Sequence, residues 1–164
     1  MKQILVTTLL GIALVLPGAA RAQQQEKSAT FRVSATVTAV CEVTASDLNF
    51  GQYTSQAGSD LTGTTKVAVA CTPATAYNVG LSAGTSPGAT VNQRKMVAGA
   101  NSLNYQLYQD SSRTKIWGTT PGTDTLPGTG TGQSVDHTVF GTIPARQVIP
   151  AGDYGDTVTV RVYF

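Results

Sequence analysis

The last eight residues, Thr157–Phe164, form the pattern that most constrains the fold of this chain. Val158, Val160, Val162 and Phe164 occupy alternate positions, and threonine, arginine and tyrosine lie between them. A period of two in β-branched and aromatic residues predicts a half-buried β-strand. The printed sequence stops inside this apolar run. We therefore expect the strand to lack a neighbour that a core strand ordinarily has on its second side.

The first 22 residues have the features of a cleaved export signal. Lys2 gives a positive start, residues 4–16 are apolar, and Ala20-Arg21-Ala22 is a small-x-small cleavage site. The apolar stretch is too short to span a bilayer. We predict cleavage after Ala22 and an exported product that is not embedded in a membrane.

Removal of this signal changes the charge of the chain. The full sequence has 11 Lys and Arg against 9 Asp and Glu, and two of the 11, Lys2 and Arg21, lie in the signal. Nine basic residues then face nine acidic ones. A neutral product gives no electrostatic reason to bind nucleic acid. The 142 residues that remain of 164 fit one domain with one core.

The two cysteines, Cys41 and Cys71, predict a disulfide, because an even count in an exported protein indicates a pair. Two free thiols are the alternative. Closing a loop of this length stabilises the fold by roughly 3–4 kcal/mol in the chain-entropy model. Two cysteines and one histidine, His137, are too few for a zinc site, and we predict no cofactor.

A second alternating run lies near the start of the exported product. Phe31, Val33, Ala35 and Val37 share one parity, which continues through Cys41. The run is longer than the usual strand of about five or six residues. It therefore predicts two strands, divided before Cys41.

Short strands separated by turn residues continue through the rest of the chain, and no window has a helical period with caps. The long Gly/Thr/Pro-rich segment 119–133 predicts a loop. This pattern is typical of an all-β sandwich. The further strands that we expect cover residues 48–53, 64–72, 77–81, 94–97, 103–108, 115–118 and 134–143.

No catalytic group emerges from the sequence. Ser134, Asp136 and His137 fall within four residues, and neighbours on one strand point to opposite faces, so they cannot form a triad alone. The glycines of 128–132 lack the lysine and following helix of a phosphate loop and predict a hairpin loop. We predict that the protein is not an enzyme.

Two groups of side chains have alternative interpretations. Trp117 with Tyr105 and Tyr108 could form a sugar-stacking surface, although packing in the core or at a sheet edge is the favoured interpretation. The basic pair Arg94-Lys95 is interpreted as a solvated surface pair.

Several motifs, taken in their order and spacing, resemble the spore coat U domain family, whose members include subunits of archaic chaperone–usher pili. The resemblance covers essentially the whole exported chain. The motifs are Phe31-x-Val-x-Ala-x-Val37, Leu48-x-Phe-Gly-x-Tyr53, Val69-x-Cys71, Leu103-x-Tyr-x-Leu-Tyr-x-Asp110, Trp117-Gly118, Phe140-Gly-Thr-Ile-Pro144 and Gly152-Asp-Tyr-x-Asp-Thr-Val-x-Val160.

The resemblance implies an incomplete immunoglobulin-like sandwich that lacks its last strand and receives it from another subunit. It implies an N-terminal extension, residues 23–39, and a sandwich domain, residues 40–164. The inserted side chains would be Phe31, Val33, Ala35 and Val37, and the acceptor groove would be bordered by Val158, Val160, Val162 and Phe164.

The same resemblance implies the partners and the location. A periplasmic chaperone would fill the groove first, and an outer-membrane usher would exchange it for the next pilus subunit. The expected role is that of a structural pilus subunit at the cell surface, in attachment and biofilm formation. A secreted carbohydrate-binding or adhesin domain, a spore-coat-type structural protein, and a segment that folds back into its own groove remain alternatives.

Overall fold

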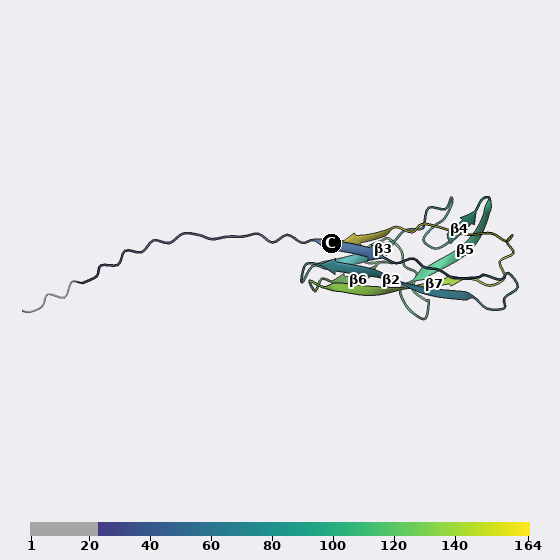
Figure 1. Cartoon of the computed structure of the whole chain (residues 1–164), viewed down its shortest axis with the longest axis horizontal. Helices are drawn as coiled ribbons and strands as arrows, with labels where there is room; N and C mark the ends of the chain where they lie inside the picture. Colours follow the sequence, from purple (N-terminus) through teal and green to yellow (C-terminus); the bar gives the residue numbers. More distant parts are fainter. Residues whose placement is uncertain (1–22) are drawn as a thin grey trace, which may run out of the picture. The chain divides into compact units, whose positions relative to one another are not determined.

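The computed structural model describes residues 23–164, and the predicted signal peptide, residues 1–22, lies outside the described residues. Residues 37–164 form one compact unit. Its regular elements are all β-strands, arranged in two sheets (Figure 1). The all-β sandwich predicted from the sequence is therefore confirmed.

The larger sheet has five strands in the order β1-β2-β7-β5-β4, and the smaller has three in the order β6-β3-β8. Each strand pair is antiparallel. β1 and β8 each lie at the end of a sheet, so each has one edge without a paired strand among residues 23–164. The strands are β1 (Cys41–Ala45), β2 (Leu61–Cys71), β3 (Ala76–Leu81), β4 (Arg94–Ala98), β5 (Asn101–Tyr108), β6 (Leu126–Thr129), β7 (Ser134–Ile143) and β8 (Val160–Tyr163).

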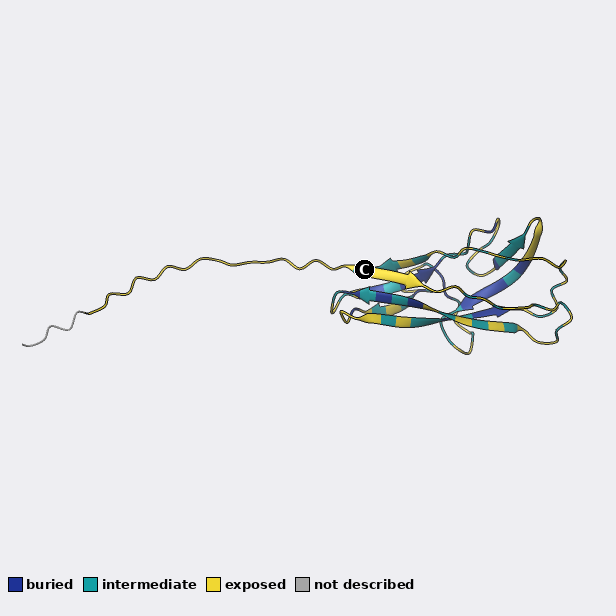
Figure 2. Ribbon diagram, viewed as in Figure 1, coloured by how far each residue is buried: buried dark blue, intermediate teal, exposed yellow. Residues whose placement is uncertain are grey.

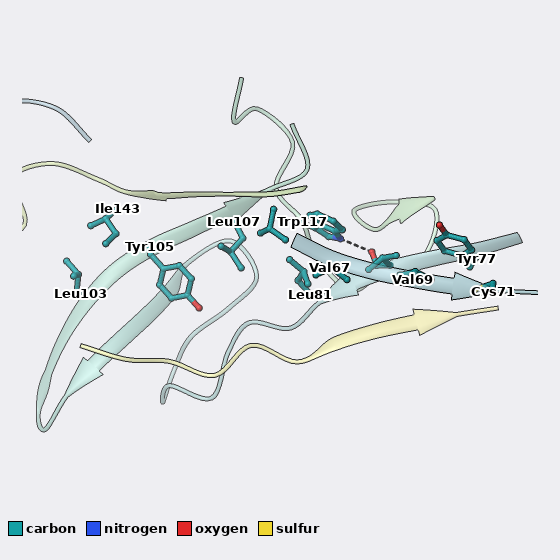
Figure 3. Close-up of a cluster of buried hydrophobic side chains, with 12 residues drawn as sticks. Val67, Val69, Cys71, Tyr77, Leu81, Leu103, Tyr105, Leu107, Trp117 and Ile143 are labelled. Carbon is teal, nitrogen blue, oxygen red and sulfur yellow. Dashed lines mark hydrogen bonds between the residues drawn. The ribbon is translucent and has the colours of Figure 1, made fainter. Parts of the chain in front are cut away.

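The core lies between the sheets and follows the alternation of the sequence. In β2, the side chains of Val67, Val69 and Cys71 are buried and the residues between them are more exposed. Trp117 is fully buried among these side chains, and its indole Nε1 donates a hydrogen bond to the carbonyl of Val79 at 2.7 Å (Figure 3). This hydrogen bond satisfies the one polar atom of the indole.

The burial of Arg94 contradicts the interpretation of Arg94-Lys95 as a solvated surface pair. Its side chain is fully buried, and burial lowers the pKa of its guanidinium from the ordinary value. The planar guanidinium has five N–H donors in a fixed fork, which suits it to several acceptors at once. It donates to the carbonyl oxygens of Ser82, Leu81, Val91 and Trp117 and to Oε1 of Gln106, at 2.6–3.1 Å.

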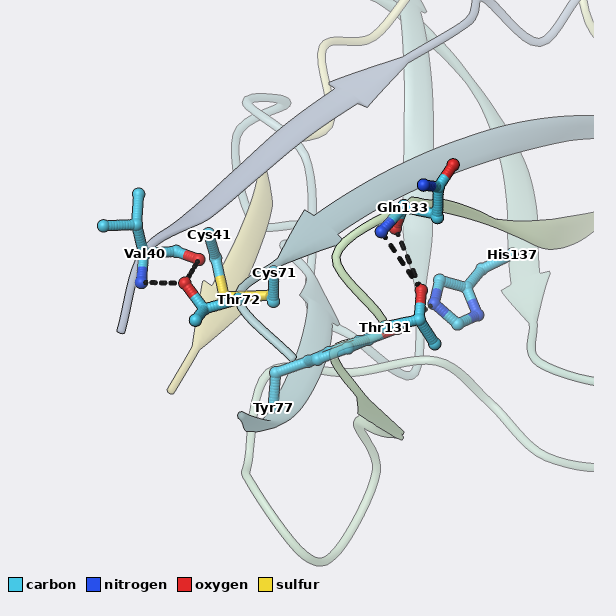
Figure 4. Close-up of a disulfide and its surroundings, with 8 residues drawn as sticks. All are labelled: Val40, Cys41, Cys71, Thr72, Tyr77, Thr131, Gln133 and His137. Carbon is cyan, nitrogen blue, oxygen red and sulfur yellow. Dashed lines mark hydrogen bonds between the residues drawn. A yellow bond between two sulfur atoms is a disulfide. The ribbon is translucent and has the colours of Figure 1, made fainter. Parts of the chain in front are cut away.

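The predicted disulfide joins the first two strands. Cys41 and Cys71 are directly opposite in the register of β1 and β2, and their sulfurs are bonded (Figure 4). Within the described residues there is no free cysteine. The bond attaches the edge strand β1 covalently to the end of β2, the next strand of the larger sheet.

Three segments differ from the sequence prediction, and close packing explains two of them. Residues 48–53 are not a strand, because Leu48 and Phe50 pack directly over the glycine Gly141, where a Cβ would meet both side chains. The loop predicted for 119–133 contains β6, because Gly128 leaves room for the ring of Tyr77. Residues 115–118 form only an isolated bridge.

The two alternating runs also differ from expectation in extent. The structure has no strand between residues 23 and 40, and β1 begins at Cys41. The large apolar side chains of the first run are exposed, Phe31 by 86% and Val33 by 81% (Figure 2). The last strand, β8, begins at Val160 rather than at Thr157.

Candidate functional site: an open groove beside the last strand

An open cavity of about 380 Å³ lies beside the segment that leads into β8. One wall runs from the last residue of β1 to Phe50, within residues 45–50, and the other lies within residues 154–160. The floor consists of core side chains from both sheets, namely Val67, Leu81, Leu107 and Val139. The hydrophobic core is thus accessible between the two walls.

The β8 wall has unpaired main-chain groups. The amide of Ser82 donates to the carbonyl of Thr159, so residues 82 and 159 are a hydrogen-bonded pair. Hydrogen-bonded and non-hydrogen-bonded pairs alternate in an antiparallel ladder. Val160, paired with Leu81, therefore directs its N–H and C=O away from β3 and toward the open edge. The same alternation applies to Val162.

The opposite wall has the same property. The amide of Ser46 donates to the carbonyl of Lys66, which makes that pair a hydrogen-bonded one. By alternation, Val43 and Ala45 in β1 direct their main-chain groups away from β2. Two strand edges with free donors and acceptors therefore border one apolar cavity, which is the arrangement that accepts an added strand.

A second cavity of about 1000 Å³ continues the groove. It shares Leu48, Phe50, Met96 and Tyr154 with the first cavity and extends to residues 51–56 on one side and 149–153 on the other. The first cavity therefore lies between the start of one wall, near residue 45, and the end of the other, near residue 160. The second cavity lies between residues near 53 and residues near 150. The two walls run in opposite directions.

Asp156 fixes the β8 wall to the core. Its carboxylate accepts hydrogen bonds from the hydroxyl of Tyr105 at 2.7 Å and from the amides of Thr85 at 2.8 Å and Thr157 at 2.9 Å. Burial alone would raise the pKa of Asp156, but these hydrogen bonds outweigh it and hold the pKa below the ordinary value. Burial, together with Asp156, raises the pKa of Tyr105, which stays a donor.

Gly155, beside Asp156, completes this attachment. It exchanges two hydrogen bonds with Val97 of β4, at 2.9 and 3.1 Å. The wall therefore begins on the larger sheet at Gly155 and ends on the smaller sheet at Val160. A segment attached at both ends holds the groove open without bonding along its own inner edge.

The structure brings together part of the predicted acceptor set. Val158 and Val160 line the first cavity. Val162 packs against the buried core further along β8, and Phe164 is 63% exposed. The groove is therefore displaced toward residue 154 relative to the sequence prediction.

Other residues of the groove were missed by sequence reasoning. The sequence predicts Leu48 and Phe50 in an ordinary strand and gives Asp156 no place in the groove. The sequence signal that could have found Asp156 is a carboxylate just before an apolar alternation. Its partner Tyr105 lies 51 residues away in the sequence, so the pair required the fold.

The residues considered for catalysis are separate in the structure. Asp136 forms an ion pair with Lys66 at 2.8 Å, and His137 contacts the hydroxyl of Tyr77 at 2.9 Å (Figure 4). Burial lowers the pKa of His137. Neither group is directed toward a serine, so the structure gives no triad.

The structure also decides the interpretation of the aromatic group. Trp117 is fully buried and Tyr105 is 6% exposed, so these two rings cannot stack on a sugar. The core-packing interpretation is confirmed for both. Among residues 23–164 no cluster of three or more histidine, cysteine or acidic side chains could hold a metal ion. Residues 23–164 also contain no helix that is long and apolar enough to cross a membrane.

Comparison with known proteins agrees with this architecture. Residues 27–161 match the model of the Spore Coat Protein U domain family. Protein U of Myxococcus xanthus is 39% identical over 128 residues, which cover 71% of each chain.

A solved structure is also similar. It is a chain in the crystal structure of the CsuC-CsuE chaperone–tip adhesion subunit pre-assembly complex, from archaic chaperone-usher Csu pili of Acinetobacter baumannii. The match has a TM-score of 0.58 and 31% identity, and it covers 79% of this chain and 40% of that one. These likenesses indicate a structural protein and not an enzyme. Since the family model spans most of the sequence, the chain belongs to the spore coat protein U domain family.

Proposed function

We propose that this protein is a structural subunit of an archaic chaperone–usher pilus. Subunits polymerise when the segment 29–38 of one copy inserts as a strand into the groove of the next. The observation that carries the proposal is the groove itself, an apolar cavity between two strand edges whose main-chain groups lack partners. The similarity to a chain of a chaperone–pilus subunit complex supports it.

The N-terminal segment supplies a matching donor. Phe31, Val33 and Val37 are exposed by 81–86%, and they alternate with polar residues as an inserted strand requires. Burying these side chains with Ala35 would contribute on the order of 5–10 kcal/mol before the ordering cost. Main-chain hydrogen bonds to both walls would add to this gain. Such joints would persist without a covalent link between subunits.

The open groove also gives a physical reason for the expected partners. An apolar cavity beside an unpaired strand edge is an aggregation hazard during export. A periplasmic chaperone would cover it until an outer-membrane usher exchanges it for the donor segment of the next subunit. We therefore propose cleavage after Ala22, export through the periplasm, and assembly at the cell surface, with a role in attachment and biofilm formation.

A deletion tests the donor assignment. A chain that lacks residues 23–38 should still bind the chaperone, because its groove is intact, but it should give no ladder of fibres on a mildly denaturing gel. A deletion of residues 23–28 alone keeps the apolar alternation and should polymerise normally. Fibres of the 23–38 deletion would refute the assignment.

A second candidate is a coat-type structural protein that polymerises differently, and the identity with Protein U favours it. The same deletion separates the two. A coat component that does not use the groove would assemble equally well without residues 23–38.

A further inference from the structure

We propose that Arg32 of the inserted segment pairs with Asp47 of the subunit that receives it, and that this ion pair helps to fix the register of insertion. The inference rests on the proposed function. The segment runs antiparallel to β8, and its inward side chains lie beside the acceptor residues as follows: Phe31 by Val160, Val33 by Val158, Ala35 by Asp156, and Val37 by Tyr154.

The charges around the groove are of one sign. Asp47, Asp153 and Asp156 line the two cavities, and no lysine or arginine does. The carboxylate of Asp156 is already occupied by Tyr105 and neighbouring amides. Asp47 is exposed and, within residues 23–164, its carboxylate takes part in no ion pair or hydrogen bond. It is available to a cation from another copy.

The donor segment carries such a cation inside its apolar alternation. Arg32 lies between Phe31 and Val33, and its side chain is exposed. When the odd-numbered side chains of the segment face the floor of the groove, Arg32 faces outward. Asp47 precedes Leu48, which packs inward, so Asp47 also lies on the outer rim. Outward residues of adjacent strands lie within about 4.5–8 Å at Cβ, which an arginine can span.

The first cavity, which is lined by core side chains, is the part of the groove that the inserted segment should cover. Residues 31–37 in an extended strand span roughly 20 Å, at about 3.3 Å per residue. The wall 154–160 contains the same number of residues, and all of them except Thr159 line the first cavity. A segment that covers the wall of this cavity in full takes one of two registers, one antiparallel and one parallel.

The antiparallel register places the two charges together. It sets Arg32 opposite Thr159, and the walls run so that Ala45 lies near Val160 and Phe50 near Tyr154. Asp47 therefore lies close to that point of the groove. The parallel register would instead set Arg32 opposite Gly155, at the end nearer Asp153. Asp153 is exposed, as Asp47 is, so charge alone does not choose the direction. The parallel register would set Val33 beside Asp156, where the ring of Tyr105 already fills the space, whereas the antiparallel register sets the smaller Ala35 there, and size therefore favours the antiparallel direction.

Neighbouring antiparallel registers are less favourable for reasons of charge and size. A slip of two residues toward the end of β8 would set Arg32 opposite Arg161, and like charges directly opposite destabilise a strand pair. In the proposed register the smallest inward side chain, Ala35, lies beside Asp156. There the hydroxyl of Tyr105 and the carboxylate already fill the space.

A reciprocal charge exchange in the full chain tests the ion pair. Arg32→Glu and Asp47→Lys should each lower the yield of fibres about three- to tenfold and make it increase with salt, because each places like charges together. The double variant should return the yield to that of the natural chain. Lys27→Glu, a basic residue outside the alternation, is the matched control and should have no effect. Circular dichroism and disulfide content confirm that each variant folds.

Three results would overturn the inference. They are rescue of Arg32→Glu by Asp153→Lys in place of Asp47→Lys, additive losses in the double variant, and no loss in either single variant. None of them touches the proposed function, since fibres that still require residues 23–38 show that the segment inserts. If that deletion polymerises, the proposed function fails first.

Discussion

Two segments of this chain share one sequence pattern and have opposite surroundings. In residues 31–37 and in residues 67–71 of β2, apolar side chains alternate with polar or small ones. Val67 and Val69 are 2% and 1% exposed, whereas Phe31 and Val33 are 86% and 81% exposed. The pattern thus specifies that a strand will bury one face, but it does not specify which sheet receives the strand.

The groove beside β8 explains how both outcomes arise in one molecule. β2 lies between two strands of its own sheet, β1 and β7. The wall formed by residues 154–160 faces an open cavity. We propose that the apolar face of residues 31–37 is buried only when this segment enters the groove of another copy.

The largest expected effect comes from placing the same charge in both segments. Val69→Asp buries an unpaired carboxylate in the core and should destabilise the fold by on the order of 5 kcal/mol, enough to prevent recovery of folded protein. Val33→Asp should leave the urea midpoint of the subunit unchanged and abolish fibres. Equal loss of subunit stability in both variants would remove the contrast between the segments.

A second pair of variants compares a buried arginine with an exposed one. Arg94→Met leaves several buried acceptors, among them the carbonyls of Leu81 and Trp117, without donors, and each orphaned group costs about 1–3 kcal/mol. We expect a loss of more than about 3 kcal/mol in urea unfolding. Arg32→Met should change that stability by less than about 0.5 kcal/mol. A stable Arg94→Met variant would contradict the role assigned to the guanidinium.

The disulfide provides a third test, because it attaches β1, the edge strand that follows the exposed segment, to the buried strand β2. Paired Cys41→Ser and Cys71→Ser substitutions open a loop with a sequence separation of 30 and should cost about 3–4 kcal/mol. Thermal unfolding with and without reductant measures this. The natural chain should lose stability on reduction, and the double serine variant should not respond. A midpoint unchanged by reduction would contradict the expected contribution.

The smallest effect concerns the pH dependence of the β8 wall. The pKa of Asp156 is lower in the folded chain than its ordinary value, so its contribution to stability is present above the unfolded pKa and is lost as the pH falls through the folded one. The free energy of unfolding of Asp156→Asn should therefore fall less than that of the natural chain as the pH is lowered from about 5 to about 2. Tyr105→Phe removes one hydrogen bond of the carboxylate and should lessen this fall in part. Urea midpoints across this range provide the measurement, and an unchanged profile for Asp156→Asn would contradict it.

Local patterns accounted for much of the fold. Alternation located β2, β3, β5 and β7 almost to their bounds, and β7 matched residues 134–143 throughout. The prediction that Cys41 and Cys71 form a disulfide is also confirmed.

The differences involve contacts between distant segments. Residues 48–53 were predicted as a strand because their pattern is correct for one, yet close packing of Leu48 and Phe50 on Gly141 replaces strand pairing there. β6 was not predicted because it lies in a Gly-rich stretch, where the absence of a Cβ at Gly128 leaves room for the ring of Tyr77. The burial of Arg94 could not be predicted, because most of its acceptors are main-chain carbonyls, which leave no signal in the sequence. Of the acceptor residues that the family resemblance implies, Val158 and Val160 line the first cavity.

A self-complemented subunit gives the most direct measurement of the central claim. Residues 29–38 are moved from the N-terminus to follow Phe164 through a flexible linker, and the structure of the resulting chain is determined. We predict a soluble monomer in which Phe31 and Val33 are buried over the first cavity and residues 31–37 hydrogen-bond to the main chain of Val158 and Val160. An open groove beside an unpaired segment, or an insoluble product with its disulfide intact, would contradict the account.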